Sequence, residues 1–278
     1  MRIMITGGNG NLARELAKVL RQNYKINALT RLELDITDCD SVIQSFSSLH
    51  PDIVINTAAL TDVDACENQF DRALTVNGKG PLYLAEACKN NGSLLVHFST
   101  EMIFDGIKTA PYLETDCPNP LSAYGLTKYV GEQNIKRTER RYAIFRTSWL
   151  FGGGVPKFVD NFIAKALQQD TINVADDQTG SPTYIRDIAH AISLFLEDPQ
   201  TGIFHLANSG SASRMDMADH INNVLDLKRK LKPISYKDLG IRTYRPPHAV
   251  LDSKYKGRYS FLRLRPWKVA LEEYLLKV

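Results

Sequence analysis

The chain has 278 residues, enough for one large domain or for one domain with a smaller lobe. Hydrophobic residues make up 44% and charged residues 23%, as in ordinary globular proteins, and the net charge of +3 has no cluster that would predict nucleic-acid binding. No apolar stretch reaches the roughly 20 residues of a membrane span, and the N-terminus lacks a signal-peptide layout. Neither the four scattered cysteines nor the six histidines show metal-site spacing. We therefore expect a cytoplasmic protein with no nucleic-acid or membrane partner and no metal.

Short β-rich runs alternate with helical patterns through the first half of the chain. Strands are predicted at 2–6, 25–29, 52–56, 93–99 and 142–148, and helices at 11–23, 39–49, about 70–91, and 121–138. Strands separated by helices of this length indicate βαβ units, and their continuous apolarity is typical of strands buried on both faces. The sequence thus predicts an α/β fold, a Rossmann-type doubly wound parallel sheet.

After Trp149 the pattern becomes shorter and less regular, beginning with the glycine-rich "FGGGVPK". We predict a helix near 157–169, a strand within "INVADDQTGSPTY", a helix–strand pair at 185–197 and 203–207, and helices near 213–226 and 267–277. The basic run "DLKRKLK" (226–232) is interpreted as a solvated turn. These elements predict a smaller C-terminal α/β substrate lobe. The expected division is a dinucleotide-binding domain at 1–149, to which 184–207 returns, and a substrate-binding lobe at 150–183 and 208–278.

A glycine-rich loop, "TGGNGNLA" (6–13), joins the first strand to the first helix. It can be parsed as Gly8-x-Gly10-x-x-Ala13 or as Gly7-x-x-Gly10-x-x-Ala13. Either version lets backbone amides approach a pyrophosphate at a helix N-terminus, where Asn11 and Leu12 begin the helix. An ordinary βα turn is the plain alternative. The position after a strand and before a helix favours a dinucleotide site.

The end of the second strand bears on which dinucleotide binds. NAD-specific sites usually carry an acidic residue about 20 residues beyond the glycines, on the ribose 2′-hydroxyl. Here Thr30 and Arg31 occupy that place, and a guanidinium suits a 2′-phosphate. Glu33 lies just beyond and could face the ribose instead. We expect NADPH, with NADH as the alternative.

A tyrosine and a lysine lie four residues apart in "SAYGLTKYVGE" (122–132), on one face of a predicted helix. Carbonyl reduction needs a proton donor, and an ammonium one turn from the Tyr124 phenol, together with the positive nicotinamide of the oxidised cofactor, would lower its pKa. Thr100, at the end of the fourth strand, could hold the carbonyl oxygen by a hydrogen bond. The plain alternative is amphipathic packing, with Tyr124 half-buried and Lys128 solvated.

Several motifs together resemble the extended short-chain dehydrogenase/reductases, and most closely the dTDP-4-dehydrorhamnose reductases. They are "TGGNGNLA", "LDITD" (34–38), "NTAALTDVDACE" (56–67), "VN" (76–77), "YGLTKYVGE" (124–132), "RTSWLFG" (146–152), "DQTGSPTY" (177–184) and "RPPHAVLD" (245–252). The resemblance spans nearly the whole chain.

The resemblance implies a role for each residue that matches the family pattern. It implies a catalytic set of Thr100, Tyr124 and Lys128. For the cofactor it adds, to the glycine-loop residues and Arg31, further contacts at Asp35, Ile36, Ala58, Ala59, Thr61 and the same Tyr124 and Lys128. For the substrate it implies contacts at Glu101, Met102, Trp149, Asp177, Gln178, Pro182 and Arg245. In the family the tryptophan packs on the deoxysugar, and the arginine faces the nucleotide.

Some positions depart from the family pattern. The family reads S-T-D-Y-V-F-D-G where this chain reads "STEMIFDG" (99–106), so Glu101 replaces an aspartate and Met102 a tyrosine of the sugar pocket. Ala249 stands where the family often has serine. Some relatives bind magnesium at a dimer interface, for which Glu15 is the one match. A homodimer is implied by the resemblance, and no metal is predicted.

The resemblance implies NADPH-dependent reduction of a nucleotide-linked 4-keto-6-deoxysugar, with dTDP-4-dehydro-L-rhamnose giving dTDP-L-rhamnose. A different deoxysugar, such as dTDP-6-deoxy-L-talose, is an alternative within the same class. A non-catalytic NADP-binding regulator resembling the methionine adenosyltransferase β subunit is an alternative from another class. An epimerase or dehydratase is a third, although dehydratases of this group usually carry an Asp-Glu pair after the threonine.

Overall fold

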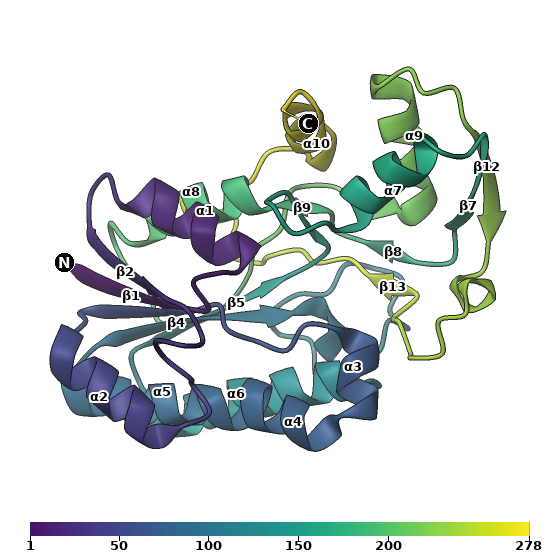
Figure 1. Ribbon diagram of the computed structural model, residues 1–278. Helices are drawn as coiled ribbons and strands as arrows, with labels where there is room; N and C mark the ends of the chain where they lie inside the picture. The colour runs from purple at the N-terminus through teal and green to yellow at the C-terminus, as the bar shows by residue number, and fades with distance from the viewer. Residues whose placement is uncertain (278) are drawn as a thin grey trace.

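The larger part of the protein is built on a six-stranded sheet (Figure 1). The computed structural model describes residues 1–277. Every pairing in this sheet is parallel. In spatial order its strands are β10 (Gly202–His205), β5 (Tyr142–Thr147), β4 (Leu94–Thr100), β3 (Ile53–Asn56), β1 (Arg2–Thr6) and β2 (Lys25–Leu29). The chain reverses its direction of travel across the sheet between β1 and β3, and a ligand crevice is expected at such a switch point.

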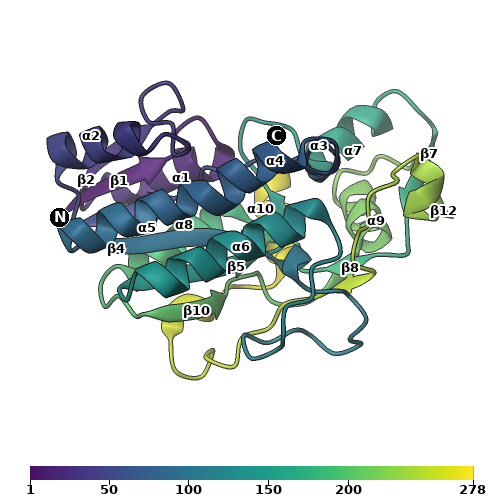
Figure 2. The same ribbon diagram turned by 90° about the horizontal axis from the view of Figure 1, so that it is seen from below.

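Helices cover both faces of this sheet (Figures 1 and 2). One face carries α1 (Asn11–Leu20) and α8 (Ile185–Phe195), and the other carries α2 (Cys39–Leu49), α5 (Gly80–Asn91) and α6 (Ala123–Thr138). Alternation along β1 explains the two cores: Ile3 and Ile5 join the α1 side, while Met4 joins the α2 side. The predicted doubly wound α/β fold is confirmed.

A smaller lobe lies beyond the carboxyl edge of the sheet (Figure 1). Its longer elements are α7 (Phe158–Ala166), β7 (Thr171–Ala175), α9 (Arg214–Val224), β12 (Lys230–Ile234) and α10 (Trp267–Leu275). Short strands complete it: β6 (Leu150–Phe151) pairs with β9 (Thr183–Tyr184), while β8 (Thr179–Gly180) lies between β11 (Ala212–Ser213) and β13 (His248–Ala249). Single turns of 3-10 helix occur at η2 (Glu101–Ile103), η3 (Tyr236–Leu239) and η4 (Ser260–Leu262).

The basic run 226–232 differs from its prediction as a turn. Only its first part turns, with positive φ at Asp226 (48°) and Lys228 (56°). From Lys230 the chain forms β12, which pairs in parallel with β7 over five residues. This strand was not predicted because it carries charged side chains. An exposed two-stranded ribbon does not need the continuous apolar run by which buried strands are recognised.

The predicted helix at 70–91 is interrupted by a π turn. It consists of α4 (Phe70–Leu74), η1 (Thr75–Lys79) and α5, and a short helix that was not predicted, α3 (Val63–Asn68), precedes it. Within the π turn, Asn77 accepts a hydrogen bond from the backbone N–H of Leu60 at 2.9 Å and donates to its carbonyl at 3.0 Å. It also donates to Thr127 of α6. Such wide turns often lie at functional sites, and this one fastens the loop after β3 to the helix that carries Tyr124.

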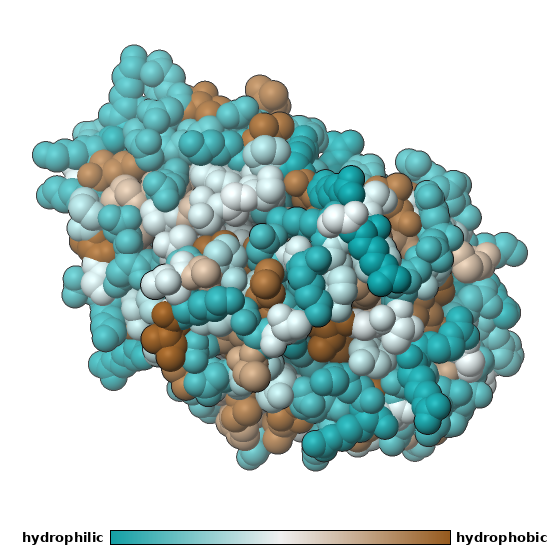
Figure 3. Space-filling view, turned by 180° about the vertical axis from the view of Figure 1, so that it is seen from behind, coloured by the Kyte–Doolittle hydropathy of each residue, from teal (hydrophilic) through white to brown (hydrophobic). Residues whose placement is uncertain are grey.

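The rear surface of the molecule is mainly hydrophilic, with apolar residues in small separate patches (Figure 3). Among residues 1–277, no helix combines the length and the apolarity that crossing a membrane requires.

Candidate functional site

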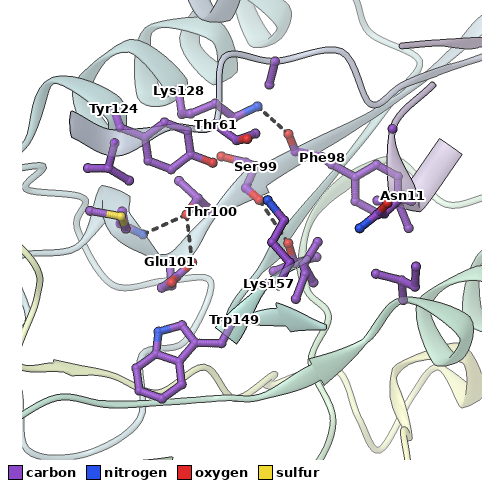
Figure 4. Close-up of a pocket in the computed structure, with 18 of the residues that line it drawn as sticks. Asn11, Thr61, Phe98, Ser99, Thr100, Glu101, Tyr124, Lys128, Trp149 and Lys157 are labelled. Atoms are coloured by element: carbon purple, nitrogen blue, oxygen red, sulfur yellow. Dashed lines mark hydrogen bonds between the residues drawn. The ribbon is translucent and has the colours of Figure 1, made fainter. Parts of the chain in front are cut away.

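A cavity of about 620 Å³ opens where the carboxyl ends of β1, β3, β4 and β5 meet the smaller lobe (Figure 4). It lies at the switch point between β1 and β3, where ligands bind in open parallel sheets. Of the predicted site residues, these line it: Gly7, Gly10, Asn11, Leu12, Ala58, Ala59, Thr61, Thr100, Glu101, Met102, Tyr124, Lys128, Trp149, Gln178 and Arg245. Those that do not line it are Arg31, Asp35, Ile36, Asp177 and Pro182.

The glycines of the β1–α1 loop have separate structural roles. Gly7 has φ of +70°, and a Cβ there would lie 3.0 Å from the backbone of Ala58. A Cβ on Gly8 would lie 2.9 Å from the carbonyl oxygen of Ala28, so Gly8 serves strand packing. Gly10 is the N-cap of α1 and leaves the first-turn amides without a side-chain partner. The Gly7-x-x-Gly10 version therefore lines the cavity, and it presents a helix N-terminus suited to an anion.

Asn11 ties this loop to the glycine-rich segment after β5. Its Nδ2 donates to Val155 O at 2.8 Å and to Gly152 O at 3.2 Å, and its Oδ1 accepts from Val155 N at 2.9 Å. Gly153 has φ of +95°, and a Cβ there would overlap the Asn11 amide. Asn11 thus closes one wall of the cavity with an amide that is already hydrogen-bonded.

The residues expected at the adenosine end lie outside the cavity lining. The Arg31 side chain is 67% exposed, and its guanidinium lies 3.2 Å from the carboxylate of Asp35. Glu33 accepts hydrogen bonds from both the N–H and the O–H of Thr30 at 2.8 Å. The carboxylate that could have faced a ribose is therefore engaged locally, and Arg31 has the exposure that a 2′-phosphate partner needs. Ile36 is buried in the core on the α2 side.

Tyr124 and Lys128 both face the cavity from the first turns of α6 (Figure 4). Ser122 caps this helix by accepting from the Gly125 N–H, which fixes where α6 begins. The Lys128 ammonium donates to Phe98 O at 2.6 Å and lies 3.4 Å from His97 Nε2. The helix and β4 thus bring Tyr124, Lys128 and Thr100 to one wall.

The pKa values of Tyr124 and Lys128 both differ from the ordinary values of these side chains. Burial and the charge of Glu101 raise the pKa of Tyr124, whereas burial lowers the pKa of Lys128 to about 8. In the free protein burial and Glu101 set the phenol pKa, and the Lys128 ammonium points at Phe98 O; the lowering expected from Lys128 with a bound nicotinamide stays a prediction. The phenol of the free protein is therefore protonated at neutral pH, and its raised pKa makes it a weaker acid than an ordinary tyrosine.

Thr100 and the residues that follow form a tight polar turn. Its hydroxyl donates to Glu101 Oε2 at 2.8 Å and accepts from the Met102 N–H at 3.2 Å. Burial raises the pKa of Glu101. Met102 is 7% exposed and lines the cavity beside it. The departures from the family pattern therefore lie in the site itself.

Trp149 occupies a strained position at the end of β5, with φ of +43°. The Arg214 guanidinium lies 3.6 Å from its ring centroid, and a Cβ on Gly180 would be 2.5 Å from the indole. Arg214 also lies 4.7 Å from the Phe158 ring. A sugar can pack on the indole face that Arg214 covers only if Arg214 moves away. The predicted packing of Trp149 on the deoxysugar therefore requires either that movement or the other face of the ring.

The remaining predicted substrate residues divide into two groups. Gln178 Nε2 and Arg245 Nη1 are buried without a hydrogen-bond partner among residues 1–277, although Arg245 Nη2 lies 3.3 Å from Asp64. Asp177 is turned away and accepts from Ser235 Oγ at 2.6 Å. Pro182 is buried between β8 and β9. Gln178 and Arg245 thus supply free hydrogen-bond donors to the cavity, whereas Asp177 and Pro182 shape the loop around β8.

Two cationic side chains in the cavity were missed from the sequence, Arg214 and Lys157. Burial lowers the pKa of Arg214 to about 10, and Glu101 and Arg245 act on it electrostatically in opposite directions. The motif S-x-x-D at Ser213 and Asp216 marks the start of α9 by its capping box, but nothing in it indicates that Arg214 reaches Trp149.

Comparisons with known proteins agree with this geometry. The family described as "RmlD substrate binding domain" matches residues 1–278. The spore coat polysaccharide biosynthesis protein SpsK of Bacillus subtilis is 38% identical, over 99% of this chain and 96% of that protein. A dTDP-4-dehydrorhamnose reductase of Aggregatibacter actinomycetemcomitans is 37% identical, over 98% of this chain and 97% of that protein.

Solved structures show the same relationship. A dTDP-4-dehydrorhamnose reductase from Clostridium acetobutylicum superposes with a TM-score of 0.96 at 36% identity, covering 100% of both chains. One from Bacillus anthracis, in complex with NADP, gives 0.96 at 33% identity, covering 100% of this chain and 99% of that one. The chain belongs to the dTDP-4-dehydrorhamnose reductase family of the extended short-chain dehydrogenase/reductases.

Proposed function

We propose that this protein is an NADPH-dependent reductase of a dTDP-linked 4-keto-6-deoxysugar, and that it converts dTDP-4-dehydro-L-rhamnose to dTDP-L-rhamnose. The observation that carries the proposal is that the α1 N-terminus and the glycine loop line the same cavity as Thr100, Tyr124 and Lys128. The names of the relatives and the NADP complex of the Bacillus anthracis protein support the substrate class and the cofactor. Homodimer formation and a cytoplasmic location stay predictions.

NADPH would supply a hydride, and the protein must supply a proton and hold the reacting groups. Tyr124, which is protonated at neutral pH, gives its phenolic proton to the carbonyl oxygen. Lys128 holds the nicotinamide ribose. The loop at Gly7 and Gly10 binds the pyrophosphate through backbone amides at the start of α1.

Thr100 orients the carbonyl oxygen, and the state of Glu101 decides whether it can donate. In the structure the Thr100 hydroxyl donates to Glu101. When Glu101 is protonated it can donate to Thr100 instead, and the Thr100 proton is then free for the substrate. Burial raises the pKa of Glu101, which brings this neutral form closer to physiological pH.

The substrate's diphosphate needs cationic partners, and the cavity offers them. Arg214, Arg245 and Lys157 line it, and Gln178 Nε2 and Arg245 Nη1 are without partners in the described chain. Guanidinium groups bind phosphate oxygens through paired hydrogen bonds. We assign the lobe side of the cavity to the nucleotide diphosphate and the Thr100–Met102 turn to the sugar.

Met102 and Glu101 line the sugar end of the cavity, where they can change which product forms. A relative 33% identical over 98% of this chain is named dTDP-4-keto-6-deoxy-D-glucose reductase. A different product, such as dTDP-6-deoxy-L-talose, is therefore the second candidate.

The test follows absorbance of reduced nicotinamide when purified protein is mixed with NADPH and dTDP-4-dehydro-L-rhamnose. We expect turnover that falls by about 10²–10⁴-fold in Tyr124→Phe, because the proton donor is lost. NADPH affinity, measured by fluorescence titration, falls far less than turnover in that variant. NMR of the product assigns the C4 configuration.

Each outcome separates the candidates. Turnover that gives the other C4 epimer overturns the rhamnose assignment but keeps the reductase. Binding of NADPH without turnover of any dTDP-4-keto-6-deoxysugar in a panel overturns the reductase and favours a non-catalytic NADP-binding regulator.

A further inference from the structure

A chain of buried polar groups runs beneath the cavity floor from β1 to Lys128. The hydroxyl of Thr6 donates to Asn56 Oδ1 at 2.6 Å, and Asn56 Nδ2 lies 3.0 Å from His97 Nδ1. His97 Nε2 lies 3.4 Å from Lys128 Nζ. All four residues are no more than 3% exposed. The chain crosses three neighbouring strands and ends on a proposed catalytic residue.

The backbone fixes the direction of these hydrogen bonds. The N–H of Ala58 can only donate, and Asn56 Oδ1 at 3.1 Å is nearer to it than its other acceptor, Thr6 Oγ1 at 3.3 Å. The Asn56 oxygen is therefore on that side, and its NH₂ group faces His97. His97 Nδ1 must accept this hydrogen bond, so it carries no proton.

The proton of the neutral His97 ring is consequently on Nε2. Burial and the neighbouring Lys128 lower the pKa of His97 well below its ordinary value, so the ring is neutral. Its Nε2–H points toward Lys128 Nζ. An amine at Nζ can accept this N–H, whereas an ammonium presents only hydrogens to it.

Other groups act on Lys128 from the elements packed around it. Nζ donates to Phe98 O of β4 at 2.6 Å, which either protonation state allows. Cys66 of α3 and Glu132 of α6 favour the ammonium electrostatically, but Glu132 is bonded by Arg146 at 2.7 Å. Tyr124 lies one turn away on α6.

We propose that Asn56 and His97 are positioning residues that lock one imidazole tautomer and thereby weaken proton binding at Lys128. The lock itself concerns the free protein. Its consequence for catalysis is that activity falls at alkaline pH, and this consequence rests on the proposed reductase function.

The tautomer is tested by NMR on protein with ¹⁵N-labelled histidine. Spectra of the six histidines are assigned for position 97 by comparison with His97→Gln. We expect His97 to show a protonated Nε2 and an unprotonated Nδ1 across neutral pH. A proton on Nδ1 overturns the proposal.

The effect on Lys128 is tested by ¹³Cε NMR titration of the lysines, assigned with Lys128→Met. Burial lowers the pKa of Lys128 to about 8, and we expect it to titrate there in the free protein, with the facing N–H acting in the same direction. Asn56→Asp keeps the acceptor for Thr6 and Ala58 but makes His97 Nδ1 a donor, which turns Nε2 into an acceptor. The pKa of Lys128 then rises by about one unit or more.

Asn77→Asp is the matched control, because it also places a buried carboxylate beside α6 but does not touch His97. A shift in Asn77→Asp as large as in Asn56→Asp would mean that added charge, not the tautomer, governs Lys128, and would overturn the proposal. An unshifted Lys128 in a folded Asn56→Asp, checked by thermal melting, overturns it too.

Activity gives the second readout. Where Lys128 must be protonated, kcat/KM falls as pH rises through about 8, and Asn56→Asp moves that fall upward by the same interval as the NMR titration. The NMR measurements need neither NADPH nor sugar, so a failed reductase assay leaves the lock itself still tested.

Discussion

The two sides of the cavity are lined by different parts of the chain, mainly backbone on one side and long side chains on the other. On the side proposed for the cofactor, backbone forms much of the lining: Gly7, Gly10 and Ala58 bring main chain close to the cavity at the ends of β1 and β3. On the substrate side, long side chains such as Arg214 and Arg245 reach in from the smaller lobe. Because backbone positions depend on the fold and side chains on single residues, the first side fixes the kind of chemistry and the second can change the substrate.

The largest expected effect concerns the stability of the sheet side. Arg146 and Glu132 form a buried ion pair between β5 and α6, 3% and 0% exposed, with contacts at 2.7 and 3.0 Å. Arg146→Met leaves Glu132 charged and unpaired, and should lower the free energy of unfolding by about 3–5 kcal/mol. Urea denaturation measures the loss.

The matched change in the lobe is Arg229→Met, which breaks a pair with Asp170, whose side chain is 96% exposed. This change should cost about 1 kcal/mol or less, because solvent screens the carboxylate. Equal losses in the two variants would show that the two sides do not differ in this way.

The next effect tests the backbone side of the cavity. Gly7→Ala places a Cβ at φ of +70° and 3.0 Å from Ala58. NADPH affinity should fall about 10–100-fold, because the loop relieves strain of about 1–3 kcal/mol by moving its amides away from the position that binds the pyrophosphate. Calorimetric titration with NADPH and, separately, with dTDP gives the comparison. Loss of dTDP binding to the same extent would contradict the separation of the two sides.

A side-chain change on the other side should have the opposite selectivity. Arg214→Met keeps an apolar stem over Trp149 but removes the guanidinium. We expect about tenfold weaker dTDP binding and unchanged NADPH binding, since a charged hydrogen bond to phosphate is lost. Arg214→Lys should fall between the two. Unchanged dTDP affinity in Arg214→Met would remove Arg214 from the nucleotide site.

The smallest effect is expected at the exposed Arg31. Arg31→Ala removes the cation proposed for the 2′-phosphate and leaves the local Thr30–Glu33 contacts in place. The preference for NADPH over NADH, as a ratio of kcat/KM values, should fall about 3–10-fold, because Arg31 is solvated. A rise in KM for NADH of the same size would assign Arg31 to the shared part of the cofactor.

The difference between the two sides also explains what could be predicted from the sequence. The sheet strands, the loop at Gly7 and Gly10, and the α6 pair of Tyr124 and Lys128 each leave a local pattern of period or spacing. The position of Arg214 leaves none, because its contact with Trp149 joins segments 65 residues apart through the packing of α9.

Electrostatic details were equally hidden from the sequence. The spacing of Tyr124 and Lys128 predicts that the ammonium lowers the phenol pKa, but it does not reveal burial, Glu101 or the carbonyl of Phe98. The interruption of the predicted helix at 70–91 was hidden for the same reason, because its π turn depends on the hydrogen bonds between Asn77 and Leu60. The periodicity of apolar residues indicates which face of a helix or strand is buried, but it does not indicate which residues distant in sequence contact that face.

Two glycines of α6 bear on how such an enzyme could acquire new substrates. A Cβ on Gly125 would overlap the carbonyl oxygen of Met102, and one on Gly131 the carbonyl oxygen of Asn77. The helix therefore rests directly on main chain at both points, and the distance from the Tyr124 phenol to the end of β4 does not depend on the size of any intervening side chain. Side chains of the proposed sugar pocket, Met102 among them, can be exchanged by mutation or by design while Tyr124, the proposed proton donor, keeps its place.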